Sequence, residues 1–208
     1  MTVFLVVATS IISTIAFYNQ QLFELFELNP YKVVHRKQYW RLITHAFIHA
    51  DWMHLIFNMI VLYSFGLGLE YYLSILKGMV SLRFPVVAYY MTMYFTAIVV
   101  ASLTTLKKYK DTFIYNSVGA SGAVSTIVFA CIFFNPWQKL LFLGIIPIPG
   151  IIFGVLYLIY SQYMSKRNHD NINHDAHLLG ALYGFTFPIL LEPKLLYGFI
   201  EQVFNFSF

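Results

Sequence analysis

The sequence predicts an all-α polytopic membrane protein with six transmembrane helices, folded as a single domain over residues 1–208. Of the 208 residues, 59% are hydrophobic and only 11% are charged, and the mean hydropathy is +0.68. Soluble domains carry about 25% charged residues. Six apolar stretches also approach the roughly 17 to 25 residues that a helix needs to cross a bilayer. We therefore expect these helices to lie in lipid.

Short connections separate the six expected spans, except after the first. The spans are Thr2–Phe17, Leu55–Leu76, Val86–Leu106, Gly119–Phe134, Leu140–Tyr163 and Ala176–Leu191. The long first loop, residues 18–53, mixes charged and aromatic side chains. Such a composition is typical of a segment that lies in the headgroup layer. We therefore expect the first loop to be interfacial.

The fourth and fifth spans have unusual features. The fourth has about 16 residues and covers roughly 24 Å, which is less than the hydrocarbon core. Its first turn is therefore expected below the membrane surface, next to a water-filled cavity. The fifth contains Pro147 and Pro149, which we expect to bend that helix.

Three polar side chains stand at the beginnings of alternate spans. His54 opens the second, Ser121 the fourth and His177 the sixth. Because two crossings return the chain to the same side of the bilayer, these residues are predicted at one membrane face and at similar depth.

Ser121 and His177 fit a nucleophile and its base, because a serine at its ordinary pKa needs a base within hydrogen-bond reach. The glycines after His177, Gly180 and Gly184, share one helix face and would let two membrane helices approach backbone to backbone. Gly122 offers a matching small residue after Ser121. The spacing therefore predicts close contact between the fourth and sixth spans.

Acyl transfer also needs donors for an oxyanion. Ser121 lies in the first turn of its helix, where backbone N–H groups lack intrahelical acceptors. His54 and Asn58 are four residues apart, so both can face the same cavity. We therefore predict the Ser121 N–H, His54 and Asn58 as oxyanion donors.

No carboxylate is well placed to complete a triad. Asp175 lies two residues before His177 and is predicted to be the N-cap of the sixth span. Glu70 lies near the opposite end of the second span. The sequence therefore favours a Ser-His dyad.

These motifs together resemble the rhomboid family of intramembrane serine proteases, over nearly the whole chain. The matching segments are Trp40-Arg41, His49-xxxx-His54-xxx-Asn58, Gly66 with Glu70, Gly119-Ala120-Ser121-Gly122 and Ala176-His177-xx-Gly180-xxx-Gly184.

The resemblance implies a rhomboid-like bundle of six helices with Ser121 as nucleophile, His177 as base and the oxyanion donors named above. It also implies a fifth helix that can move to admit substrate. Residues outside the reacting groups are expected to support the site: His49, Trp40, Arg41, Glu70, Gly119, Gly122, Gly180 and Gly184. One position departs from the family, because many members have a tyrosine packed on the histidine one turn after the serine, where this chain has Ser125.

Several other interpretations are open from the sequence. A rhomboid-like pseudoprotease would bind membrane proteins without cleaving them, although both Ser121 and His177 are present. A small transporter would spread its polar groups across the bilayer instead of placing them at one face. His54 and Asn58 could instead form hydrogen bonds between helices. His45 and His49 are four residues apart, a spacing at which two histidines on one helix face can bind zinc.

We expect no metal or organic cofactor, because no HExxH or cysteine-rich motif is present. The expected partners are transmembrane protein substrates and membrane lipids. The net charge of +4 does not indicate nucleic-acid binding, since the basic residues are scattered over short loops beside membrane helices.

The orientation expected from the family conflicts with the distribution of charge. A cytoplasmic N-terminus would leave nine Lys and Arg residues on the outer side and four on the inner side. The positive-inside rule favours the reverse. We keep the family orientation and expect a multi-pass protein of the plasma membrane.

Overall fold

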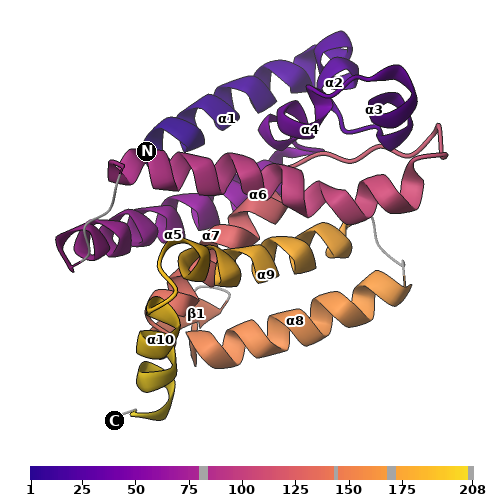
Figure 1. Cartoon of the computed structure of the whole chain (residues 1–208). Coiled ribbons are helices and arrows are strands. Elements are labelled where there is room, and N and C mark those ends of the chain that lie inside the picture. The colour runs from indigo at the N-terminus through magenta and orange to yellow at the C-terminus, as the bar shows by residue number, and fades with distance from the viewer. Residues whose placement is uncertain (80–83, 143–144, 168–171, 206–208) are drawn as a thin grey trace.

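The computed structural model describes residues 1–79, 84–142, 145–167 and 172–205 as a helical bundle with one β-hairpin (Figure 1). The helices are α1 Thr2–Tyr18, α2 Gln20–Phe26, α3 Pro30–Arg36, α4 Arg41–Thr44, the 3-10 turn η1 His45–Phe47, α5 Trp52–Met79, α6 Val86–Tyr109, α7 Ser121–Phe134, α8 Gly150–Arg167, α9 His174–Leu191 and α10 Leu195–Phe204. The strands are β1 Lys139–Phe142 and β2 Ile146–Pro149.

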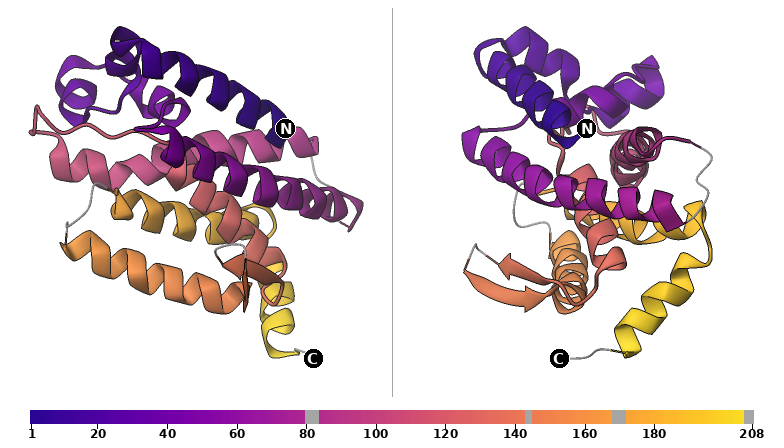
Figure 2. Two further views of the ribbon diagram at one scale, coloured as in Figure 1. Left: turned by 180° about the vertical axis from the view of Figure 1, so that it is seen from behind. Right: turned by 90° about the vertical axis from the view of Figure 1, so that its left-hand side faces the viewer.

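Helix α7 runs through the middle of the bundle (Figure 2). Its first residue is Ser121. The helix contacts α5, α6, α8 and α9, and every residue from Gly122 to Phe133 is buried. With 14 residues it is about 21 Å long, so the expectation of a short fourth helix is confirmed. Its position in the centre allows side chains from several helices to meet at its N-terminal end.

The helices expected at four of the other five spans are present with small shifts of their ends. Among the described helices, two are long and apolar enough to cross a bilayer by themselves, Trp52–Gly78 and Val86–Tyr109, while α1, α7 and α10 are shorter apolar helices. The number of six spans therefore stays a prediction.

The expected fifth span, Leu140–Tyr163, is wrong before Gly150. The antiparallel pair β1 and β2 is formed by Lys139–Phe142 and Ile146–Pro149, and in it Pro147 faces Leu141 and Pro149 faces Lys139. Proline lacks the N–H that a helix interior requires, but an edge strand tolerates it. Helix α8 accordingly begins at Gly150, so Pro147 and Pro149 precede it and do not bend it.

The long first loop folds into α2, α3, α4 and η1, a layer of short helices beside α1 and one end of α6 (Figure 1). Leu28 and Ser117 exchange backbone hydrogen bonds of 2.9 and 3.0 Å. The side-chain nitrogen of Asn29 donates to the carbonyl of Phe113 at 2.9 Å. The first loop therefore supports the segment that leads into α7.

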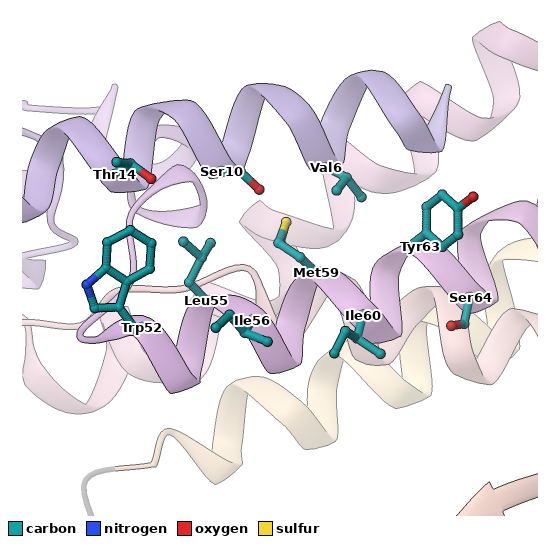
Figure 3. Close-up of a pocket in the computed structure, with 10 residues that line it drawn as sticks. All are labelled: Val6, Ser10, Thr14, Trp52, Leu55, Ile56, Met59, Ile60, Tyr63 and Ser64. Atoms are coloured by element: carbon teal, nitrogen blue, oxygen red, sulfur yellow. The ribbon is translucent and has the colours of Figure 1, made fainter. Parts of the chain in front are cut away.

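A groove of about 420 Å³ lies between α1 and α5 (Figure 3). Apolar side chains of α5, including Leu55 and Met59, line one wall, and Ser10 and Thr14 of α1 line the other. The residues that line this groove include none of the predicted site residues. The candidate site must therefore lie elsewhere, at the beginning of α7.

Candidate active site

Ser121 is the first residue of α7 and lies at the end of the helix where an anion is favoured. Val124 N–H makes the first intrahelical hydrogen bond of α7, to Ala120 O at 2.9 Å. The N–H groups of Ser121, Gly122 and Ala123 therefore have no acceptor within their own helix, and the helix dipole favours negative charge there. The Ser121 N–H is thus available as an oxyanion donor.

The first turns of α7 and α9 pack backbone to backbone. A Cβ added to Gly122 would lie 3.4 Å from the carbonyl oxygen of Ala176, and one added to Gly180 would collide with the carbonyl of Gly122. Ser121 directly precedes Gly122, and His177 directly follows Ala176. The predicted contact between the two helices is confirmed, and it brings the turns that carry both residues together.

The same packing continues one turn further along. A Cβ on Gly184 would collide with the carbonyl of Thr126, whose hydroxyl donates to the Gly180 carbonyl at 2.8 Å. Thr126 is fully buried. This hydrogen bond fixes α9 relative to α7 along their common axis, which in turn fixes the height of His177 relative to Ser121.

His54 packs against the segment just before Ser121. A Cβ on Gly119 would lie 2.9 Å from His54 Nε2, and the backbone φ of Gly119 is +112°, so only glycine fits here without strain. Ala50 N–H lies 3.5 Å from His54 Nδ1. Because Nδ1 is the acceptor, the neutral ring carries its proton on Nε2, the nitrogen that faces Gly119.

Asn58 lies one turn below His54 and is buried. Its side-chain nitrogen donates to the His54 carbonyl at 2.8 Å. This bond uses one of the two amide hydrogens, so a second hydrogen remains to serve as a donor. Its predicted role at the oxyanion stays a prediction.

His49 holds the next residue of the same segment. Its Nε2 accepts from the Ala120 N–H at 3.4 Å, so its proton is on Nδ1, which donates to Ser13 Oγ at 2.9 Å. Ser13 in turn donates to the Phe47 carbonyl at 2.9 Å. In this series of hydrogen bonds, the His49 ring and the Ser13 hydroxyl each accept one bond and donate one. His49 therefore anchors the approach to Ser121 on α1.

His45 and His49 are both neutral because they are buried. Burial lowers the pKa of His49 to about 3, with a further contribution from the adjacent His54, and lowers the pKa of His45 to about 4. His45 Nδ1 donates to the Arg41 carbonyl at 2.8 Å, and its own carbonyl accepts from Gly119 N–H at 2.9 Å. The two rings bind different partners, which does not favour the zinc pair considered from the sequence.

Comparison with known proteins assigns the family. The sequence model of the rhomboid domain matches residues 36–194, which is most of the chain. This chain belongs to the rhomboid family. It is similar to RHOMBOID-like protein 12, mitochondrial, from Arabidopsis thaliana, with 30% identity over 154 residues, 67% of this chain. The match covers 43% of that relative, so the chain spans less than half of its length.

Membership in the rhomboid family makes the chain an integral membrane protein with a polytopic helical fold. The matched residues include every predicted site residue, from Trp40 to Gly184.

The first loop shows the contacts of two of these residues, Trp40 and Arg41. Arg41 Nη1 donates to the carbonyls of Glu24 and Glu27, each at 2.7 Å, and Trp40 Nε1 donates to the Leu25 carbonyl at 3.4 Å. Both residues tie α4 to the end of α2.

Glu70 lies far along α5 from the candidate site. Its carboxylate accepts from the Thr2 N–H at 2.6 Å. Gly66, one turn earlier, leaves room for the Thr2 side chain and the hydroxyl of Tyr90, either of which a Cβ would meet within 2.7 Å. Glu70 and Gly66 therefore join α5 to the beginning of α1.

Asp175 is not the N-cap that the sequence suggested. Helix α9 begins two residues before the expected start, and Asn173 Oδ1 accepts from the Ala176 N–H at 3.1 Å as the cap. The Asp175 carboxylate accepts a hydrogen bond from Ser165 and lies 3.6 Å from Lys108 Nζ. It therefore joins the ends of α6 and α8 to α9.

The sequence did not identify the aromatic ring beside His177. Tyr157 of α8 lies with its ring centroid 6.3 Å from that of His177, at an interplanar angle of 19°. Its hydroxyl is 2.7 Å from the hydroxyl of Ser125. The sequence shows that Ser125 stands where many family members have a tyrosine, but nothing in it distinguishes Tyr157 from the other aromatic residues of residues 140–163.

Proposed function

We propose that this rhomboid is an intramembrane serine endopeptidase that cleaves peptide bonds in or near transmembrane segments of other membrane proteins. The observation that carries the proposal is the backbone contact of Gly122 with Ala176 and Gly180, because it joins the turns that hold Ser121 and His177. Two residues that are 56 positions apart in the sequence therefore belong to adjacent helical turns.

In the proposed reaction, Ser121 Oγ attacks the scissile carbonyl while His177 accepts the hydroxyl proton. His177 then returns the proton to the leaving amine, and water hydrolyses the acyl-enzyme by the same route. The Ser121 N–H and the Nε2–H of His54 support the oxyanion, and Asn58 contributes its remaining amide hydrogen. Removal of one such donor typically costs about 3 to 4 kcal/mol in the transition state.

The proposed dyad needs no acidic third member. The carboxylate nearest to His177 in the sequence, Asp175, binds Ser165 and Lys108. No metal or organic cofactor enters the scheme. The proposed partners are single-pass membrane proteins as substrates and the surrounding lipids; the plasma membrane remains our proposed location, whereas the named relative is described as mitochondrial.

Cleavage in proteoliposomes tests the proposal. The purified protein is reconstituted with labelled single-pass substrates whose transmembrane segments contain small residues. We expect product bands with the wild type and none with Ser121→Ala or His177→Ala. Ser74→Ala is the matched control, because Ser74 is exposed and bonds only within its own helix.

A pseudoprotease gives a different result in the same experiment. It would retain the substrates in a pull-down from the liposomes, with no product from any variant. Product that persists in Ser121→Ala would contradict the assignment of the nucleophile.

A further inference from the structure

Ser125 and Tyr157 form a pair across two helices at the site. Ser125 is one turn after Ser121 on α7 and is buried, with 7% of its surface exposed. Its hydroxyl lies 2.7 Å from that of Tyr157 on α8. Because a buried hydroxyl needs a partner, this bond fixes the end of the tyrosine ring against α7.

The same ring lies beside His177. The two rings are nearly parallel, with an interplanar angle of 19° and centroids 6.3 Å apart. This separation falls within the range of offset-stacked aromatic pairs. Phe129 of α7 and Phe153 of α8 pack against Tyr157 with centroids 5.5 and 5.9 Å away. The tyrosine is therefore held by α7 and α8 while it contacts a ring of α9.

Helix α8 can bring Tyr157 this close because small residues face α7. A Cβ added to Gly154 would touch Phe129 at 3.4 Å, and one added to Gly150 would lie 3.3 Å from Ile132. Beyond this contact, α8 turns apolar side chains outward, such as Ile159, which is 62% exposed. Helix α8 therefore packs on α7 through one of its faces, and Tyr157 lies on that face.

We infer that Tyr157 is a positioning residue that holds His177 for the reaction, with Ser125 orienting the tyrosine. This inference rests on the proposed function. The ring restricts the rotation of the imidazole about its side-chain bonds, and the Ser125 hydroxyl restricts the ring. Because Tyr157 belongs to α8, the support exists only while α8 lies against α7. The imidazole of His177 is therefore held in its reactive orientation only when α8 is packed against α7.

Two measurements on the full chain in detergent test the inference. The first is the rate of labelling at Ser121 by a fluorophosphonate probe. We expect Tyr157→Leu to lower this rate by about tenfold or more, because misplacement of a catalytic group is costly. Tyr157→Phe, which retains the ring, should remain within about threefold of the wild type. Tyr163→Leu, on the same helix and half exposed, is the control and should label as the wild type does.

Rescue distinguishes positioning from a general loss of structure. Ser125→Tyr in the Tyr157→Leu background returns an aromatic ring to the position that the family uses on α7. We expect this double variant to recover labelling relative to Tyr157→Leu.

The second measurement does not depend on activity. Histidine labelled with ¹³C at Cε1 gives one signal per residue, and His177→Gln assigns the signal of His177. Loss of the Tyr157 ring current should shift this signal in Tyr157→Leu but not in Tyr163→Leu. Wild-type labelling by Tyr157→Leu together with an unmoved His177 signal would overturn the inference and leave the proposed function standing. If Ser121 of the wild type does not label, the proposed function fails, and the His177 signal alone still decides whether Tyr157 contacts the imidazole.

Discussion

His49 and His54 fix the backbone before Ser121 through opposite tautomers. His49 accepts from Ala120 on Nε2 and donates from Nδ1, whereas His54 accepts on Nδ1 and presents its Nε2–H to Gly119. Their rings meet edge to face, with centroids 4.9 Å apart. A proton added to either ring would remove an acceptor and place a charge beside the other ring. The two histidine rings must therefore both be neutral for these contacts to form.

Replacement of His49 should weaken both the fold and the site. His49→Phe keeps a ring but leaves the buried Ala120 N–H without its acceptor, which costs about 1 to 3 kcal/mol. We expect a lower melting temperature in detergent and slower labelling of Ser121. His35→Phe is the matched control, because His35 lies on the surface and bonds Asp111, which is exposed. A loss of equal size in both variants would contradict the role given to His49.

The buried histidines also predict how stability depends on pH. The pKa values of His45 and His49 fall from the ordinary 6.5 to about 4 and about 3 in the folded protein. The unfolded chain then binds more protons below pH 6.5, so each ring contributes stability that is complete above this pH. That stability is lost as the pH falls toward 4 and 3, at up to about 1.4 kcal/mol per pH unit for each ring.

Melting curves between pH 7.5 and 4 test this dependence. We expect the wild type to melt at progressively lower temperature below pH 6.5. His49→Phe should show a shallower slope, since it lacks one of the buried rings that titrate. An equal slope in the two proteins would rule out His49 as a source of the pH dependence.

At the scale of the helices, the α7–α9 contact depends on positions where no side chain fits. Gly180 and Gly184 face carbonyl groups of α7, so even a methyl group must push α9 away. Gly180→Ala should cost about 1 to 3 kcal/mol, the usual range for overpacking, and should abolish most cleavage by separating Ser121 from His177. Gly198→Ala in α10 meets nothing within 4 Å and should be neutral or slightly stabilising.

Thermal unfolding and substrate cleavage measured on both glycine variants check this expectation. The decisive comparison is between the two positions, because each change adds the same methyl group to a helix. If Gly180→Ala cleaved substrate at the rate of Gly198→Ala, close packing of α7 and α9 would not be required for the reaction.

The helices were predictable from the sequence where composition and small residues determine them. Five of the six apolar stretches located α1, α5, α6, α7 and α9, and the remaining one located α8 only from Gly150 onward. The Gly180-xxx-Gly184 pattern predicted which two helices meet. The strands Lys139–Phe142 and Ile146–Pro149 were missed because their composition is as apolar as a membrane helix, although the prolines of the second strand argue against a helix. Helix α10 was missed because ten residues are too few to span a bilayer.

At the scale of the whole molecule, the sequence predicted which helix starts lie together and several residues that support them, but not the partners of those residues. Counting spans placed His54, Ser121 and His177 at one end of the bundle, and the described structure places their helix starts together. The hydrogen bond of His49 with Ser13 and the contact of Tyr157 with His177 depend on side-chain packing between distant segments. No spacing along the chain encodes either pair.

Orientation in the membrane is a prediction of the whole molecule. The family orientation places the N-terminus in the cytoplasm and the site at the opposite side, against the count of basic residues. Reporter fusions at residue 1 and after Phe208 measure it directly. We expect a cytoplasmic signal at the N-terminal fusion, and a non-cytoplasmic signal at both ends would reverse the assignment.

The measurement that tests the central claim most directly is the mapping of fluorophosphonate labelling by mass spectrometry in intact protein. We predict that the wild type carries the probe on Ser121 alone and that His177→Ala, which keeps the serine but lacks its base, is not labelled. Labelling of His177→Ala at the wild-type rate, or modification of a serine other than Ser121, would contradict the Ser-His dyad.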